Sequence, residues 1–274
     1  MSRWIIGGAS ARGSAHIRTG KPNQDAVSWG QSPDGTRLVG AVSDGHGAAA
    51  HFRSEIGSEI AVRCAVSLLL HHLDDRWIDD SDSAIAEEIL ALWRQDVSAH
   101  LAANPYDEAE ALMPQPTPLS PYGATLAAFA ASHAMIFTLH IGDGDLLLGY
   151  ADGRLERPLR PDAGLRGEET YSLCLPDAVE RFRVAARWRQ SGEALPDFLF
   201  AASDGVSKSF RDDASFVAAI AAMRVRAERD WDALMAALPD WLAEISAGGS
   251  GDDCTVCIAI SAEVHAPADS DRGN

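Results

Sequence analysis

Four aspartates of this chain adjoin apolar segments whose composition is typical of buried β-strands. Asp44 and Asp204 each end such a segment and are followed by a glycine, which can turn the chain sharply. Asp25 and Asp252 stand just before strand-like segments. Rigid strand ends can hold several carboxylates together, but unpaired anions at close range repel one another in a medium of low dielectric constant. Divalent cations between them would remove that conflict.

Metal coordination is therefore the chemistry that these aspartates predict. Carboxylate oxygens favour hard ions, Mg²⁺ or Mn²⁺, over zinc. A single Asp-Gly after a strand is usually only a turn. Four aspartates next to strands, one of them inside Asp44-Gly45-His46-Gly47, favour the metal interpretation over the turn.

The elements that must position these aspartates begin with short apolar runs separated by turn residues, a pattern typical of antiparallel strands. Over the first 43 residues the predicted strands are 4–6, 15–17, 26–29 and 37–42. Apolar residues then recur on one face over 52–68 and again over 85–97, which predicts two amphipathic helices. Five prolines in 104–121 predict a loop there.

The second half of the chain repeats this order of strands followed by helices. Helical spacing over 231–245 precedes a last strand at 254–261, and Pro239 is expected to kink or restart that helix. Because strands and helices occur in groups, we expect an α+β fold with antiparallel sheets covered by helices. The other predicted strands are 123–129, 135–139, 146–150, 182–184 and 197–201, with a hairpin turn at 152–153.

Length, charge and hydropathy limit what the protein can be. The 274 residues fit one compact domain, which we place at 1–262, with a flexible polar tail at 263–274. A net charge of −17 disfavours nucleic acid as a partner, because an acidic surface repels phosphate backbones. No apolar run reaches the roughly 20 residues of a membrane helix, and the N-terminus lacks a signal-peptide core. We therefore expect a cytoplasmic protein without a membrane partner.

Cys254 and Cys257 form a Cys-x-x-Cys pair, which in other contexts suggests redox chemistry or half of a zinc site. Here the pair lies in a β-branched run that is typical of a strand, and strand residues three apart point to opposite faces. No second Cys-x-x-Cys is present in the sequence. We therefore interpret both cysteines as structural.

Six short motifs resemble, in the same order, those of the metal-dependent protein serine/threonine phosphatases of the PP2C (PPM) type. The motifs are Asn23-Gln24-Asp25-Ala26, Val42-Ser43-Asp44-Gly45-His46-Gly47, Gly123-Ala124-Thr125, Ile141-Gly142-Asp143-Gly144, Ala202-Ser203-Asp204-Gly205-Val206 and Gly251-Asp252-Asp253-Cys254-Thr255-Val256. Each motif alone is weak, but six in sequence at suitable spacing are a strong resemblance. The opening Gly13-Ser14-Ala15-His16 is more similar to a divergent bacterial branch than to the eukaryotic enzymes.

The resemblance implies a four-layer αββα sandwich, in which two antiparallel sheets are flanked by helices and a binuclear Mn²⁺ or Mg²⁺ centre lies at one edge. Asp143 matches the family's ligand for a weaker third ion, shared with Asp204. The polar segment 157–180 lies where the family has its mobile flap near the site. By the same resemblance, the two main ions would be held by Asp25, Asp44, the backbone carbonyl of Gly45, Asp204 and Asp252.

The implied activity is hydrolysis of phosphoserine and phosphothreonine in a protein substrate, such as the target of a cognate serine/threonine kinase, by a monomeric enzyme. A water that bridges the two metals loses a proton and attacks phosphorus in line, without a phosphoenzyme. His46, two residues after Asp44, would act as the general acid that protonates the leaving alkoxide. Ordinary surface or packing roles are expected for His16, His51, His71 and His72.

Two departures from the family pattern bear on the site. Where the family has a phosphate-binding arginine, five residues before the first metal aspartate, this chain has Gly20. Arg18 and Lys21 are the nearby cations that would attract the substrate phosphate. Gln24 replaces the usual glutamate beside Asp25. The alternative function is a catalytically weak PP2C-like module that binds phosphoproteins or regulates partners, a reading that the missing arginine favours and the intact aspartates oppose.

Overall fold

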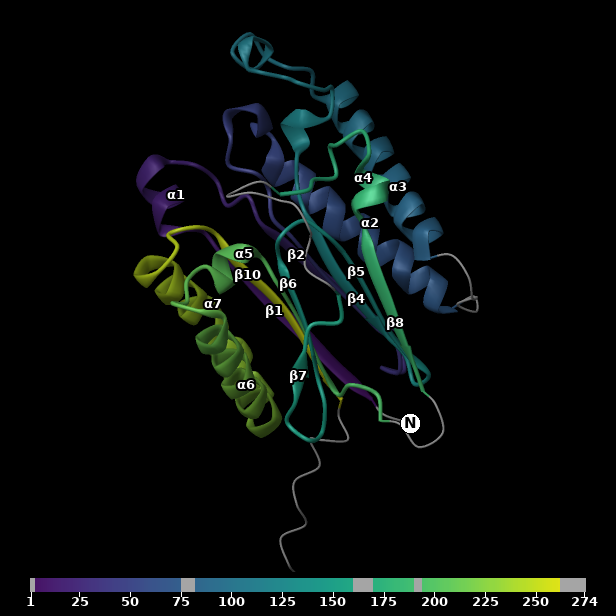
Figure 1. Cartoon of the computed structure of the whole chain (residues 1–274). Coiled ribbons are helices and arrows are strands. Elements are labelled where there is room, and N and C mark those ends of the chain that lie inside the picture. Colours follow the sequence, from purple (N-terminus) through teal and green to yellow (C-terminus); the bar gives the residue numbers. More distant parts are fainter. Residues whose placement is uncertain (1–2, 75–81, 160–169, 190–193, 262–274) are drawn as a thin grey trace, which may run out of the picture.

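Four layers make up the part of the chain that the structure describes. This structure is a computed structural model, and it describes residues 3–74, 82–159, 170–189 and 194–261. Two five-stranded sheets pack face to face, and helices cover the outer face of each (Figure 1). All strand pairings in the two sheets of this described part are antiparallel. The expected αββα sandwich is confirmed.

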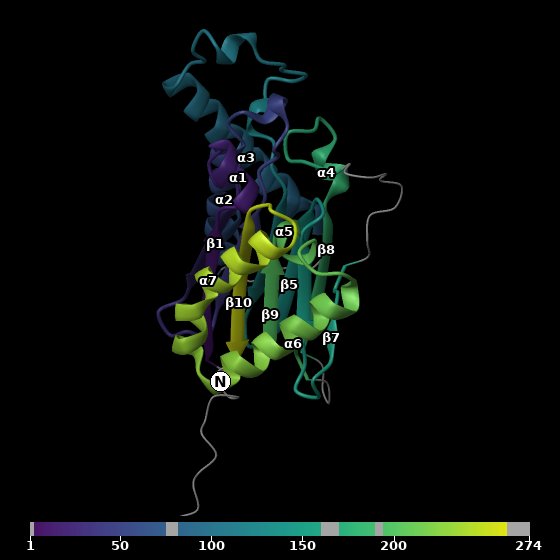
Figure 2. The same ribbon diagram turned by 90° about the vertical axis from the view of Figure 1, so that its left-hand side faces the viewer.

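The first sheet joins the two ends of the described chain, because the first strand of the chain, β1, pairs with the last, β10. The strand order is β1-β10-β9-β6-β7, and β1 pairs with β10 from Trp4 opposite Ser261 to Ala11 opposite Cys254. Two helices, α6 (Asp213–Arg229) and α7 (Trp231–Gly248), cover its outer face (Figure 2). The strands are β1 (Trp4–Ala11), β10 (Cys254–Ser261), β9 (Phe198–Ala202), β6 (Asp145–Gly149) and β7 (Leu155–Glu156).

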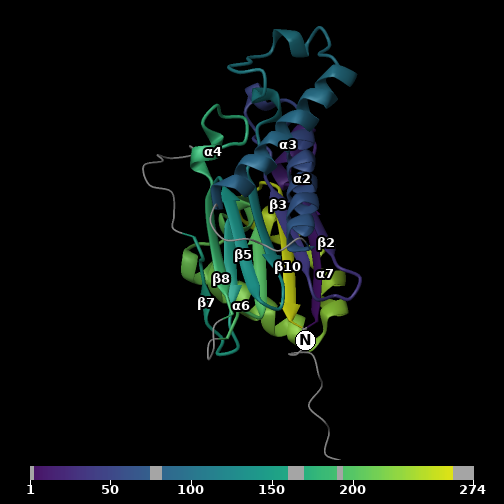
Figure 3. The same cartoon turned by 90° about the vertical axis from the view of Figure 1, so that its right-hand side faces the viewer.

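The second sheet has the strand order β2-β3-β4-β5-β8. The two long helices α2 (Ser54–Asp74) and α3 (Asp82–Ala103) lie across its outer face, as Figure 3 shows, with the short helix α4 (Ala178–Arg181) beside them. The strands are β2 (Ala26–Gln31), β3 (Leu38–Ser43), β4 (Leu126–Ala131), β5 (Met135–Ile141) and β8 (Arg183–Trp188).

Apolar side chains fill the space between every pair of layers. On β9, Leu199 packs between the two sheets, whereas its neighbour Phe200 packs under α6 and α7. The same alternation places Cys257 between the sheets and Cys254 on the helix-covered face, so the prediction of opposite faces is confirmed. Both thiols are free and buried. Because both faces of these strands are covered, every position of β9 and β10 is buried and the sequence shows continuous apolar runs.

The prediction of a strand at 15–17 is wrong. These residues lie in the helix α1 (Ser14–Thr19), which ends at Gly20 with a φ of 76°. Three residues are too few to separate a strand period from one turn of helix. Ile17 is 61% exposed and so supplies no core contact that would favour a strand. The N–H groups of the first turn of this helix instead donate to residues near the C-terminal end of the described chain. Ala15 N–H, for example, donates to Gly251 O at 2.8 Å.

The prediction for the C-terminal helix needs one correction. The helix α7 runs from Trp231 to Gly248 with Pro239 inside it, so it does not restart there. Its buried residues Leu234, Leu238 and Leu242 keep the helical spacing on both sides of the proline. Proline has no N–H and so removes one backbone hydrogen bond from the helix. The free energy gained by burying that face against the first sheet outweighs this loss.

The remaining sequence predictions concern the proline-rich loop, the absence of a membrane helix, the tail and the flap. The segment 104–121 forms the predicted loop, with two short 3₁₀ helices, η2 (Glu110–Leu112) and η3 (Ser120–Tyr122), of which only η3 contains a proline. The prediction that no apolar run reaches the length of a membrane helix needs correction, because among the described helices the segment Ser54–Leu73 is long and apolar enough; half of that window is buried in the structure, as in a core helix. The predicted tail 263–274 and residues 160–169 of the predicted flap lie outside the described residues.

Candidate metal centre

The strand-end aspartates gather at the end of the sandwich that carries α1 and α5 (Asp204–Ser207) (Figure 2). Strand register explains why. The start of β2 pairs with the end of β3, and the start of β10 pairs with the end of β9. Each of the four aspartates predicted to bind the two main ions lies within two residues of one of these strand ends. These aspartates are Asp25, Asp44, Asp204 and Asp252. Only the packing of one sheet on the other brings the two pairs together.

Asp25 is buried, with 8% of its surface exposed. Its Oδ2 has no hydrogen-bond partner among the described residues. Burial raises the pKa of Asp25 well above its usual range, and the charges of Asp253 and Asp204 add to that rise, although the Ser203 and Thr255 side chains oppose it. A buried carboxylate oxygen without a donor is costly unless a cation binds it. This carboxylate therefore fits a metal ligand.

Asp44 and Asp204 lie against the other carboxylates. Burial raises the pKa of Asp44 well above its usual range, and Asp25, Asp204 and Asp252 each raise it further. Burial also raises the pKa of Asp204 to about 6, with the charge of Asp143 as the next cause. These mutual effects show that folding has brought all five aspartates of the sequence prediction into one cluster. Like charges at this spacing are the condition that divalent cations relieve.

Gly45, whose backbone carbonyl was predicted to bind metal, lies in a position that admits no side chain. A Cβ at Gly45 would lie 2.5 Å from Gln24 O. Gly45 N–H donates to the same oxygen at 3.1 Å, and Gly45 pairs with Ala124 in an isolated bridge. Gln24, the neutral replacement for glutamate, donates through Nε2 to His46 O at 3.2 Å and to Ser54 Oγ. These bonds tie the start of β2 to the loop that carries the predicted general acid.

A lysine that sequence reasoning missed lies among the acids. Lys208 Nζ donates to Asp204 Oδ2 in a close ion pair and lies 3.8 Å from Asp143 Oδ2. Burial lowers the pKa of Lys208, but the hydrogen bond and charge of Asp204 outweigh it, so the pKa is raised and the ammonium stays charged. The available signal was the spacing, because Lys208 follows Asp204 by four residues, one helical turn.

An open cleft of about 520 Å³ lies over this cluster. The residues around it belong to the loop after β3 with the 3₁₀ helix η1 (Ala49–His51), the loop after β5, the segment 170–175, α5 with the residue that follows it, and Asp252. The lining residues are Asp44, His46, Gly47, Ala48, His51, Asp143, Thr170, Ser172, Cys174, Leu175, Asp204, Lys208 and Asp252. A phosphorylated side chain entering the cleft would therefore meet the carboxylates, His46 and Lys208.

The two cations proposed for phosphate attraction do not line this cleft. Arg18 is exposed on α1, and its Nη1 donates to Ser14 Oγ at 3.4 Å. Lys21 Nζ donates to Gly47 O at 2.8 Å, which places Lys21 beside the loop that carries His46. Gly20 ends α1 and leaves that position without a side chain. Lys21 is thus at the rim of the site, and Arg18 lies one step further out.

His46 lines the cleft with its ring edge-on to His51, at a distance of 4.9 Å between ring centroids. His51 Nδ1 donates to the backbone oxygen of Ser120, so its other ring nitrogen faces away from that bond. Burial lowers the pKa of His46 to about 4, with the charge of His51 as the next cause and Asp143 opposing. His46 is therefore neutral at neutral pH in the protein without metal or substrate. His51, predicted to have an ordinary packing role, is part of the site.

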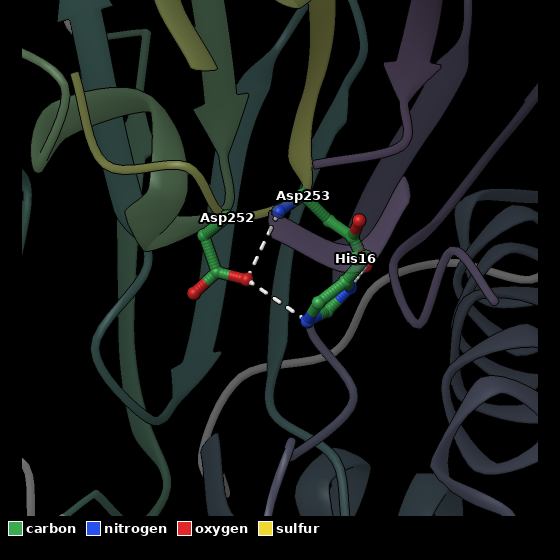
Figure 4. A group of neighbouring side chains, drawn as sticks. All are labelled: His16, Asp252 and Asp253. Carbon is green, nitrogen blue, oxygen red and sulfur yellow. Dashed lines mark hydrogen bonds and ion pairs between the residues drawn. The ribbon is translucent and has the colours of Figure 1, made fainter. Parts of the chain in front are cut away.

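Asp253, to which sequence reasoning gave no role, connects three segments at the edge of the site. Its Oδ1 accepts from Gly13 N–H, and its Oδ2 accepts from Gln24 N–H, both at 2.6 Å. His16 Nδ1 lies 2.9 Å from the same Oδ2, and His16 Nε2 lies 3.7 Å from Asp252 Oδ1. Figure 4 shows the His16 ring between the two carboxylates. Because N–H groups already occupy Asp253, this trio positions Asp252 and the start of β2, and His16 is no ordinary surface residue.

The comparisons with solved structures agree with this architecture. The catalytic domain of the serine/threonine protein phosphatase PstP, in complex with two manganese ions, matches with 20% identity and a TM-score of 0.56, over 95% of this chain and 99% of that one. PppA of Pseudomonas aeruginosa, described as a key regulatory component of T6SS, matches with 18% identity and a TM-score of 0.59, over 95% and 98%. The S. agalactiae serine/threonine phosphatase matches with 17% identity and a TM-score of 0.57, over 94% and 99%. No curated protein gives a significant match.

The family profile described as Protein phosphatase 2C matches residues 12–243. The chain therefore belongs to the protein phosphatase 2C family. It is accordingly a metal-dependent phosphoprotein phosphatase that acts on serine and threonine phosphates, a hydrolase.

Proposed function

We propose that the cleft beside α1 and α5 is the active site, and that two divalent cations, Mn²⁺ or Mg²⁺, bind there. The observation that carries the proposal is the cluster of mutually repelling carboxylates, of which Asp25 and Asp204 are buried, with one oxygen of Asp25 left without a donor. The PstP structure with two manganese ions supports the choice of ion and number. The proposed ligands are Asp25, Asp44, the carbonyl of Gly45, Asp204 and Asp252.

The protein's part in the reaction is to place these ligands and to shape access to them. When bound, the two cations would supply a water activated at neutral pH and would neutralise charge on the phosphoryl oxygens. The strand ends hold the carboxylates before substrate arrives, because β2, β3, β9 and β10 are fixed by ladder pairing. Thr170 and Ser172 form the wall of the cleft on the side of the predicted flap.

His46 is the proposed general acid for the leaving alkoxide. Its low pKa, about 4, makes the imidazolium a strong acid but leaves little of it at neutral pH. A substrate phosphate dianion in the cleft would raise that pKa by attraction to the protonated ring. Asp143 already acts in this direction, because its charge raises the pKa of His46. Protonation of His46 is thus coupled to substrate binding.

The setting in which we propose that this enzyme works is the cytoplasm, as a monomer of one domain, 1–262, with a polar tail. The four free, buried cysteines support a reducing compartment. The net charge of −17 opposes binding of nucleic acid and of anionic membranes. The proposed substrates are proteins phosphorylated by a cognate serine/threonine kinase.

The deciding experiment is hydrolysis of a phosphothreonine peptide with Mn²⁺, with Mg²⁺ and after chelation, compared between the wild type and Asp44→Asn. We expect metal-dependent release of phosphate that chelation abolishes and added Mn²⁺ restores. Asp44→Asn should lose at least about a hundredfold in kcat/KM, because one of the groups that neutralise the cations is gone. Tight peptide binding without turnover under any metal condition would instead support the alternative of a phosphoprotein-binding module.

A further inference from the structure

The chain has only two lysines against 21 arginines, and both lie at the proposed site. Lys21 binds the backbone of Gly47 at the rim, whereas Lys208 reaches into the acidic cluster. Lys208 is positioned by its own helix: Lys208 N–H donates to Asp204 O at 2.8 Å, which sets its side chain one turn from the Asp204 carboxylate. The ammonium therefore has a defined place between Asp204 and Asp143.

The oxygens of Asp143 are both engaged by residues of this chain. Thr170 Oγ1 donates to Asp143 Oδ1 at 2.9 Å, and Lys208 Nζ lies 3.8 Å from Asp143 Oδ2. The same Nζ contacts Asp204 Oδ2. These two carboxylates are the pair that would share a third metal ion by the family resemblance. In this chain a fixed cation stands between them.

Charge balance favours one ammonium there over a third divalent ion. The four main carboxylates match the charge of two divalent cations, which leaves Asp143 as the one aspartate of the described cleft lining whose negative charge they do not compensate. Lys208 supplies a single positive charge at that point and is half exposed, so it remains partly hydrated. A third divalent ion would have to displace the ammonium and then leave an excess of positive charge among close neighbours.

We propose that Lys208 takes the place of a third metal ion in this enzyme, so that the site works with two divalent cations and one built-in ammonium shared by Asp143 and Asp204. The inference rests on the proposed two-metal function. It also assigns Lys208 a task that the cations near Gly20 do not perform, because among Arg18, Lys21 and Lys208, all three of which the structure describes, Lys208 alone lines the cleft.

The test counts Mn²⁺ bound per chain by electron paramagnetic resonance of the free aqueous ion during titration. We expect two ions in the wild type and in Lys208→Arg, which keeps the charge. We expect one additional, weaker ion in Lys208→Gln, and its loss in the double variant Lys208→Gln/Asp143→Asn. The matched control is Lys21→Gln, which removes the other lysine and should stay at two ions.

Each outcome has a distinct meaning. A third ion in the wild type, or a count that stays at two in Lys208→Gln, overturns the inference while leaving the two-metal function intact. No bound Mn²⁺ in the wild type would overturn the proposed function itself, and the inference with it. Thermal unfolding of Lys208→Gln and Lys208→Arg, measured alongside, checks that both variants are folded when the ions are counted.

Discussion

Carboxylates at the proposed site behave differently from ordinary surface aspartates because folding moves them into one cluster, in which Asp25 and Asp204 are buried. Asp204 shows the effect most directly: burial and the neighbouring Asp143 raise its pKa to about 6. In the protein without metal, the folded state then holds a proton on Asp204 that the unfolded state has lost between about pH 4 and 6. This contribution to stability is present at low pH and is lost as the pH rises through 6.

Metal binding should therefore release protons at low pH. A cation bound to Asp204 displaces the proton, so we expect Mn²⁺ affinity to increase from pH 5.5 to pH 7.5 and proton release to be larger at pH 5.5. Calorimetric titration in two buffers of different ionisation enthalpy measures the number of protons released. Asp204→Asn should reduce that number. Equal release at both pH values would contradict the assignment of Asp204 as a ligand.

His46 can be separated from the metal ligands by the choice of leaving group. We expect His46→Ala to slow hydrolysis of alkyl phosphates by roughly 10²–10⁴-fold and that of nitrophenyl phosphate by less than about tenfold, because nitrophenolate scarcely needs a proton. The increase in melting temperature caused by Mn²⁺ should be retained in the variant. Equal losses on both substrates would remove His46 from the role of general acid.

The missing arginine at Gly20 leads to a prediction for the nearby cations. A guanidinium bound to phosphate through two hydrogen bonds contributes about 1.5–3 kcal/mol, so without it we expect weak affinity for small phosphate esters. Arg18→Ala and Lys21→Ala should each raise KM on one phosphopeptide, with Lys21→Ala the larger because Lys21 lies beside the His46 loop. The matched control is Arg229→Ala, in the last turn of α6. Changes in kcat/KM under about twofold for both variants would show that neither residue attracts the phosphate.

At the scale of elements, α1 is held from outside rather than by its own residues. It is six residues long, and none of them is buried. Such a short helix is not stable alone. Its position depends on Ser246, Gly251 and Asp253, which accept hydrogen bonds from its first turn and the residue before it. The loop before β10 thus fixes both the helix and the start of β2, where the metal centre begins.

Asp253→Asn should loosen this connection without unfolding the sheets. An asparagine would turn an amide N–H₂ toward a backbone N–H or toward His16, and a lost buried hydrogen bond costs about 1–3 kcal/mol. We expect a lower melting temperature and faster amide hydrogen exchange over residues 13–24, with the amides of β3 and β9 unchanged. Asp240→Asn, at an exposed position of α7, is the matched control. Unchanged exchange over 13–24 would show that Asp253 does not hold this segment.

At the scale of the whole molecule, the proposed metal centre spans both sheets, because Asp25 and Asp44 continue strands of one sheet and Asp204 and Asp252 adjoin strands of the other. Cations bound there would connect the two halves of the sandwich. The apolar layer between the sheets already makes them depend on each other. We therefore propose that residues 1–262 unfold in one cooperative step.

Millimolar Mn²⁺ should raise the melting temperature of the intact protein. A ligand at a hundred times its dissociation constant stabilises the folded state by about 2.7 kcal/mol, which corresponds to roughly 5–10 °C for a chain of this size. Asp44→Asn and Asp204→Asn should each lose most of that rise, whereas Asp240→Asn should keep it. Calorimetry records both the shift and the number of transitions. A melting curve that does not change across the Mn²⁺ titration would count against the metal centre, and two separate transitions would contradict one domain.

The sequence alone predicted much of this architecture where the local signal is strong. The continuous apolar runs that become β9 and β10 are recognisable as strands because both of their faces are buried. The stripes over 52–68 and 85–97 become α2 and α3 for the same kind of reason, a helical period sustained over many turns. Asp44 and Asp204 stood out because each directly follows such a strand.

Tertiary structure decided what depends on partners distant in the chain. The segment 15–17 is helical because Gly251 accepts the N–H of Ala15 and Asp253 accepts the N–H of Gly13, just before the helix, and no local pattern encodes contacts across more than 200 residues. His16 and Asp253 lie within recognised motifs but their roles there did not follow from the motifs, and Lys208 belongs to none of the six motifs; their places at the site exist only once β10, α5 and the start of β2 meet. The sequence by itself determined most of the strands, the long helices α2, α3 and α7, and the aspartates next to the strands, whereas α6 was not predicted. The packing of one sheet on the other decided which charges oppose those aspartates, since electrostatic interaction depends on distance in space rather than along the chain.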